Sequence, residues 1–79
     1  MKFTRKFPAL DSIMMRTGIK GKWRRGENYN QYRANSGAVL NWWESTGTIT
    51  FQGPEAAAEK LKKAFVKARQ EAREAHAQN

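Results

Sequence analysis

Basic and aromatic side chains alternate over one central stretch of the sequence, and together they suit a polyanion that carries planar bases. The stretch covers residues 20–33 and holds Lys20, Lys22, Trp23, Arg24, Arg25, Tyr29, Tyr32 and Arg33. Lysine and arginine neutralise phosphates, whereas aromatic rings stack on exposed bases. The alternative is that Trp23 and one tyrosine belong to the hydrophobic core, and for Trp23 and Trp42 the pattern favours the core.

Residues that could catalyse a reaction are few and scattered. His76 is the only histidine and Asp11 the only aspartate, while Glu44 lies in a predicted turn without a second carboxylate nearby. The sequence contains no metal-ligand spacing, nucleophile elbow or phosphate-binding loop. We therefore expect a binding protein rather than an enzyme, with no catalytic residue, no metal site and no cofactor.

The positive charge is concentrated in the first part of the chain. The formal net charge is +8 at pH 7, and residues 1–33 carry nine basic and two acidic side chains. Residues 34–79 carry six basic and five acidic side chains, so they are nearly neutral. This asymmetry favours an anionic partner, with DNA or RNA first, although solubility alone is an alternative explanation.

A β-hairpin is predicted for residues 39–52, with a turn that ends at Gly47. An even loop that sets Trp43 opposite Thr48 alternates the side chains between two faces. The apolar face then carries Leu40, Trp42, Ile49 and Phe51. The polar face carries Val39, Asn41, Trp43, Thr48, Thr50 and Gln52. An odd loop would exchange these partners, but the even loop alone gives one wholly apolar face.

Two further strands are predicted before this hairpin. In residues 19–25, one face carries Ile19, Gly21, Trp23 and Arg25, and the other carries Lys20, Lys22 and Arg24. In residues 29–34, Tyr29 and Gln31 lie on the face opposite to Asn30, Tyr32 and Ala34. Residues 8–18 predict a short helix, with a loop as the alternative, and residues 1–7 predict an edge strand or an arm.

The longest predicted helix is Pro54–His76, which is rich in alanine and has no internal glycine or proline. Its apolar stripe contains few bulky side chains beyond Leu61 and Phe65, and the chain end through Asn79 is expected to fray. The prediction is one α+β domain over residues 1–79, in which this helix backs an antiparallel sheet of three or four strands. The predicted core is Leu40, Trp42, Ile49, Phe51, Leu61 and Phe65.

The run from Val39 to Gly53, followed by an alanine-rich helix, resembles part of a known domain. It is similar to the TBP-like domain that precedes the catalytic domain in bacterial ribonuclease HIII, over residues 38–66. The resemblance implies a curved sheet that binds nucleic acid, with Trp43, Asn41, Thr50 and Gln52 on its open face. The sequence departs from the family in having no ribonuclease H domain and one half of a duplicated unit. The short basic form also resembles small phage and prophage proteins.

These patterns predict a non-catalytic nucleic-acid-binding protein with little base specificity. The predicted phosphate ligands are Lys20, Lys22, Arg24, Arg25 and Arg33. Trp43 and Tyr32 would stack on bases, beside Asn41 and Thr50 of the polar face. The alternative is a small protein-interaction module, such as a phage-type inhibitor or adaptor, that binds an acidic protein through Trp43, Trp23 and Tyr32.

The compartment and the oligomeric state follow from simpler features. There is no cysteine, which fits a reducing cytosol. No continuous apolar run follows the first basic residues, so we expect a cytoplasmic protein without a signal peptide or a membrane partner. Open sheet edges and the thin helix stripe favour a homodimer, although basic edges would repel unless an anion bridges them.

Overall fold

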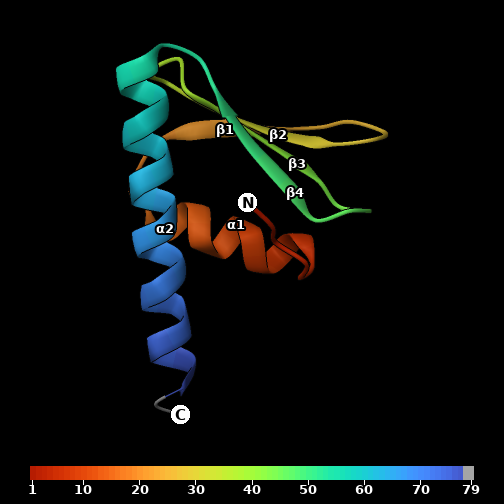
Figure 1. Cartoon of the computed structure of the whole chain (residues 1–79), viewed down its shortest axis with the longest axis vertical. Coiled ribbons are helices and arrows are strands. Elements are labelled where there is room, and N and C mark those ends of the chain that lie inside the picture. The colour runs from red at the N-terminus through yellow and green to blue at the C-terminus, as the bar shows by residue number, and fades with distance from the viewer. Residues whose placement is uncertain (78–79) are drawn as a thin grey trace.

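Two helices and four strands follow one another along the chain, with one helix before the strands and one after them (Figure 1). The structure, a computed structural model, describes residues 1–77, and side chains as far as Glu74. The elements are α1 (Phe7–Arg16), β1 (Gly21–Arg25), β2 (Asn30–Ala34), β3 (Val39–Trp43), β4 (Thr48–Gln52) and α2 (Glu55–Ala77). The predicted α+β fold is confirmed, and the short N-terminal helix is present. The expected fraying through Asn79 lies outside the described residues.

The strands form one antiparallel sheet in the order β1-β2-β3-β4, so each strand pairs with its neighbour in the sequence. Trp43 lies opposite Thr48 and Leu40 lies opposite Phe51, which confirms the even register of the last hairpin. Gly47 ends the turn with a φ of +77°, a backbone conformation that glycine adopts without the clash of a Cβ.

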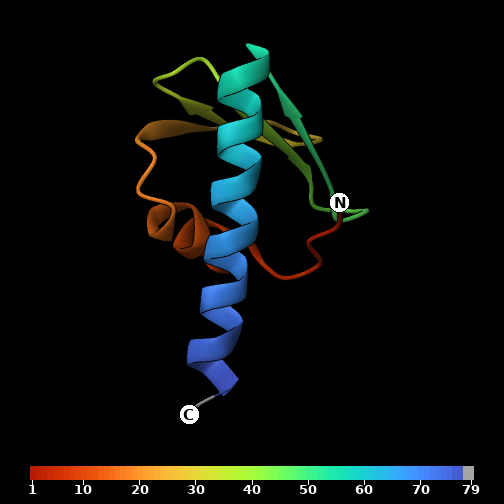
Figure 2. The ribbon, with the colours of Figure 1, turned by 60° about the vertical axis from the view of Figure 1, so that its left-hand side comes forward.

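Both helices pack on the same face of the sheet (Figure 1, Figure 2). Most of the predicted core is confirmed, because the buried side chains include Leu40, Trp42, Ile49, Leu61 and Phe65. Phe51 is only half-buried and packs against this cluster. The core is larger than predicted, since it also contains Phe3, Leu10, Ile13, Met14 and Tyr32.

The first three residues continue the sheet beyond β4. Lys2 forms an antiparallel bridge with Thr48, and the Phe3 N–H donates to the Gly47 carbonyl at 2.6 Å. The Phe3 ring meets Trp42 edge to face, and the Trp42 Nε1 donates to the Phe3 carbonyl at 2.9 Å. The N-terminal segment is therefore an arm that covers part of the β4 edge and completes the core beside Trp42.

The two tryptophans that were predicted for the core both lie on the helix side of the sheet. Trp42 has no exposed surface, whereas Trp23 is half-buried. The Trp23 Nε1 donates to the Asp11 carboxylate at 2.9 Å, and its ring meets Phe7 and Tyr32 edge to face. Asp11 therefore pairs with the polar end of a core side chain and fixes α1 against β1.

Candidate nucleic-acid interface

Within residues 1–77, no helix crosses the face of the sheet that points away from α1 and α2 (Figure 2). The strand register places on this face Lys22, Arg24, Gln31, Arg33, Val39, Asn41, Trp43, Thr48, Thr50 and Gln52. Tyr29 joins them because its ring stacks on Trp43. We call this set the open face. It combines cations from β1 and β2 with polar side chains from β2 to β4, and it contains no carboxylate.

Asn41 is the centre of a hydrogen-bond network that crosses the open face from β2 to β4. The Gln31 Nε2 donates to the Asn41 Oδ1 at 2.8 Å. The Asn41 Nδ2 donates to Gln52 Oε1 at 2.9 Å and to Thr50 Oγ1 at 3.3 Å. Asn41 is only 3% exposed although no helix covers it, because its own neighbours enclose it. Since its polar atoms are all paired, its burial costs little, and it holds the surrounding side chains in place.

The direction of these hydrogen bonds is set by Arg33. Its Nε donates to the Gln31 Oε1 at 2.7 Å, and a guanidinium group has donors but no acceptor. Gln31 must therefore turn its Nε2 toward Asn41, which in turn presents its Nδ2 to Gln52. The network ends on the amide nitrogen of Gln52 and on the remaining guanidinium nitrogens of Arg33. The nitrogen groups at both ends are thus donors, which suit a ligand rich in acceptors.

Tyr29 and Trp43 form an aromatic pair at the end of the open face, where β2 begins and β3 ends. Their ring centroids are 5.2 Å apart and their planes differ by 26°, so the rings stack. Trp43 is half-buried, whereas Tyr29 is 40% exposed. Trp43 therefore supports one face of the Tyr29 ring, and Tyr29 presents much of its surface to solvent.

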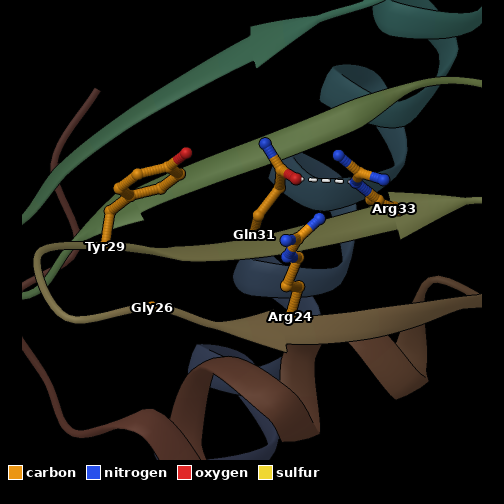
Figure 3. A pocket seen from close by; sticks show the side chains of 5 residues that line it. All are labelled: Arg24, Gly26, Tyr29, Gln31 and Arg33. Carbon is orange, nitrogen blue, oxygen red and sulfur yellow. Dashed lines mark hydrogen bonds between the residues drawn. The ribbon is translucent and has the colours of Figure 1, made fainter.

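A hollow of about 340 Å³ on the open face is lined by Arg24, Gly26, Tyr29, Gln31 and Arg33 (Figure 3). Arg24 lies opposite Gln31 in the strand register, and Arg33 follows Gln31 on the same face of β2. Both guanidinium groups therefore flank the Gln31 side chain. Among the described residues, the one ion pair joins Lys63 to Glu59 on α2, so neither arginine is neutralised by a carboxylate. Unpaired guanidinium groups beside a polar hollow attract an anion.

The structure gathers most of the predicted binding residues on the open face. These are Lys22, Arg24, Arg33, Asn41, Trp43 and Thr50. Lys20 does not join them, because it precedes β1 and lines a separate hollow with Ala57 and Lys60 of α2.

Tyr32 and Arg25 lie on the opposite face of the sheet. The base stacking predicted for Tyr32 needs correction, whereas the phosphate contact predicted for Arg25 stays a prediction. Tyr32 lies opposite Leu40, is 7% exposed and donates its hydroxyl to the Ile19 carbonyl at 2.7 Å. Its ring is part of the core and cannot stack on a base. The Arg25 guanidinium lies 3.8 Å from the centre of the Phe7 ring, and its Nε donates to Asn30. Arg25 is exposed but separated from the hydrogen-bond network of the open face.

Tyr29 and Gln31 belong to the open face but were missing from the predicted site. The signal for both was available, since the alternation of the strand places them together and opposite to Tyr32. What the sequence did not supply was the pairing of β2 with β3, which brings Gln31 opposite Asn41. That pairing decides which side of β2 faces the helices.

The fold and the site define a small α+β protein whose antiparallel sheet has one face packed by helices and one polar, basic face left open. Comparisons of the chain with protein-family models, curated proteins and solved structures returned no match. The resemblance of residues 38–66 to a TBP-like domain therefore stays a prediction.

Neither helix, as far as the structure describes them, has the length and apolar character needed to cross a bilayer. The described residues also bring together no group of three side chains of the kinds that hold a metal ion.

Proposed function

We propose that this protein binds nucleic acid through the open face. The observation that carries the proposal is the joint presence there of unpaired arginines and a solvent-exposed aromatic stack. Arg24 and Arg33 flank the hollow, and Tyr29 lies at its end. Phosphates would be held by the guanidinium groups and by the donors at the ends of the Asn41 network, whereas bases would contact the ring.

Little base specificity is expected from this arrangement. Phosphate contacts carry no sequence information, and aromatic stacking accepts every base. The amide groups that could read a base edge are largely paired with one another, as at Gln31 and Asn41. The open face is therefore suited to holding a strand rather than to selecting a sequence.

The second candidate function is binding to an acidic protein surface. The observation in its favour is that tyrosine, tryptophan and arginine, which meet here at Tyr29, Trp43 and Arg24, are the residues enriched at protein interfaces. A pull-down from a nuclease-treated lysate separates the two functions. A stoichiometric protein partner that survives the nuclease would favour the interaction module, and loss of every partner would favour nucleic acid.

The direct test is a titration of labelled single- and double-stranded oligonucleotides at two salt concentrations. The R24A/R33A double variant should bind at least tenfold more weakly at low salt. Its salt slope should fall by about 0.7 to 0.9 for each phosphate contact that is lost. The matched control is K62A/K67A, which removes the same charge from exposed positions on α2. Absence of binding at low salt, salt-insensitive binding, or equal losses in both double variants would reject the open face as the site.

A further inference from the structure

We propose that the open face selects single-stranded nucleic acid, with Tyr29 as the residue that stacks on an unpaired base. This inference rests on the proposed function and names the strand form and a binding residue for it. Trp43 covers one face of the Tyr29 ring at a centroid distance of 5.2 Å, and Tyr29 remains 40% exposed. An incoming base would extend an existing stack rather than form one from mobile side chains.

The single strand is favoured because of what a stacking ring requires. In a duplex, each internal base is already stacked on both sides and paired along its edge, so its face is closed to a side chain. Bases of a single strand can be splayed out and stacked on aromatic rings. A protein that used phosphate contacts alone would have no need of an aromatic stack beside its arginines.

The spacing of Tyr29, which precedes β2, and of Gln31 and Arg33 on β2 matches a short segment of a nucleic-acid strand. Tyr29, Gln31 and Arg33 lie on one face at alternate positions (Figure 3). At about 3.3 Å per residue, the ring and the far arginine are roughly 13 Å apart along the strand. This distance corresponds to about four nucleotides at the stacked spacing of about 3.4 Å, and to fewer if the backbone is extended. The site therefore fits a base at Tyr29 and phosphates at Arg24 and Arg33.

The hydrogen-bond network supports the same orientation of the ligand. Its ends present donors, from the Arg33 guanidinium and the Gln52 amide nitrogen, and the phosphate oxygens of a strand are acceptors only. The charged and donor-rich part of the open face would thus follow the backbone. The Tyr29 ring would stack on a base that projects from this backbone toward the open face.

The test compares three ligands of equal length: a thymidine single strand, an abasic sugar-phosphate strand and a duplex. The informative variant is Y29L, which keeps an apolar side chain but removes the ring, and the matched control is Y29F, which keeps the ring. Y29L should weaken binding of the thymidine strand about 5- to 150-fold and leave binding of the abasic strand unchanged. Y29F should bind both strands like the unmodified protein.

The outcomes separate this inference from the proposed function. Binding of all three ligands with equal affinity, unaffected by Y29L but reduced by R24A/R33A, would overturn the single-strand inference and leave nucleic-acid binding intact. Binding of none of the ligands at low salt would overturn both. Thermal unfolding of Y29L guards against misfolding. A cooperative transition is expected, with a midpoint lowered by roughly 2 to 12 °C because the stack on Trp43 is lost.

Discussion

The burial of Tyr32 is expected to make the stability of the fold depend on pH. Burial first, and the negative charge of Asp11 second, raise the pKa of its phenol above the ordinary value of 10.0. The folded protein therefore holds this proton more tightly than the unfolded chain does. The stabilisation is complete below the ordinary pKa and is lost as the pH rises through the raised value.

The Tyr32→Phe variant is expected to test this coupling. Loss of the hydrogen bond to the Ile19 carbonyl should lower the free energy of unfolding by about 1 kcal/mol at neutral pH. Above pH 10, the difference in stability between the two proteins should shrink, because the phenol of the unmodified protein ionises more readily in the unfolded chain than in the folded protein. The phenylalanine variant has no phenol at this position and loses no stability in this way. Urea unfolding at neutral and alkaline pH measures both. A difference that stays constant with pH would contradict the prediction.

The two tyrosines of the β1–β2 region also show what the sequence could decide about the site. Alternation along the strand correctly placed Tyr29 and Tyr32 on opposite faces, but it could not say which face the helices would cover. That choice depends on the pairing of Tyr32 with Leu40 across β2 and β3. The sequence therefore located the basic and aromatic region but assigned base stacking to the buried tyrosine.

At the scale of the elements, α2 is attached to the sheet through a small number of bulky side chains. Leu61 and Phe65 are buried, and the Phe65 ring lies 6.0 Å from that of Phe51 on β4. The remaining stripe consists of alanines, of which Ala68 is buried. Most of the apolar contact between helix and sheet therefore depends on Phe65 and Leu61.

Replacement of Phe65 by alanine should lower the free energy of unfolding by about 3–5 kcal/mol, because the site is fully buried and a cavity would remain. The neighbouring Val66 is 46% exposed, and V66A should change stability by less than about 0.5 kcal/mol. Denaturant unfolding of both variants checks the prediction. Similar losses in the two variants would mean that α2 does not pack on the sheet through Phe65.

The elements also differ in how far the sequence could predict them. The hairpin register and the long helix follow from local alternation and alanine content, and both were predicted correctly. Residues 1–7 were predicted as an edge strand or an arm, but the contact of Phe3 with Trp42 was not predictable, because the two residues are 39 positions apart in the chain. For α1, local periodicity left a helix and a loop open. The packing of Leu10, Ile13 and Met14 into the core provides the tertiary support for the helix.

At the scale of the whole molecule, the sheet edges limit how two copies could associate. The edge strands are β1 and β4, and the N-terminal arm covers part of β4 through the bridge from Lys2 to Thr48. The thin stripe of α2, which favoured a dimer, is supplemented by buried side chains of α1. If the dimer expected from the sequence forms, β1 is therefore the edge strand through which the two copies would mainly pair.

A two-fold pairing of β1 strands would join the open faces of two copies but would also bring like charges together. If the pairing is centred on Trp23, Lys22 of one copy lies opposite Arg24 of the second copy, and like charges in such positions destabilise a sheet. Nucleic acid bound across the joined faces would neutralise the charges of both side chains. We therefore predict a monomer in the free state and two copies side by side on a sufficiently long single strand.

Sedimentation equilibrium at moderate salt, with and without such an oligonucleotide, tests this prediction. The K22E variant gives a second test, because a carboxylate at position 22 would attract Arg24 of the second copy, whereas lysine repels it. This variant should dimerise without nucleic acid, whereas K62E, which makes the same charge change on exposed α2, should stay monomeric. A dimer of the unmodified protein without oligonucleotide would contradict the role of the charges. A monomeric K22E, with one copy bound per long strand, would show that β1 is not an interface.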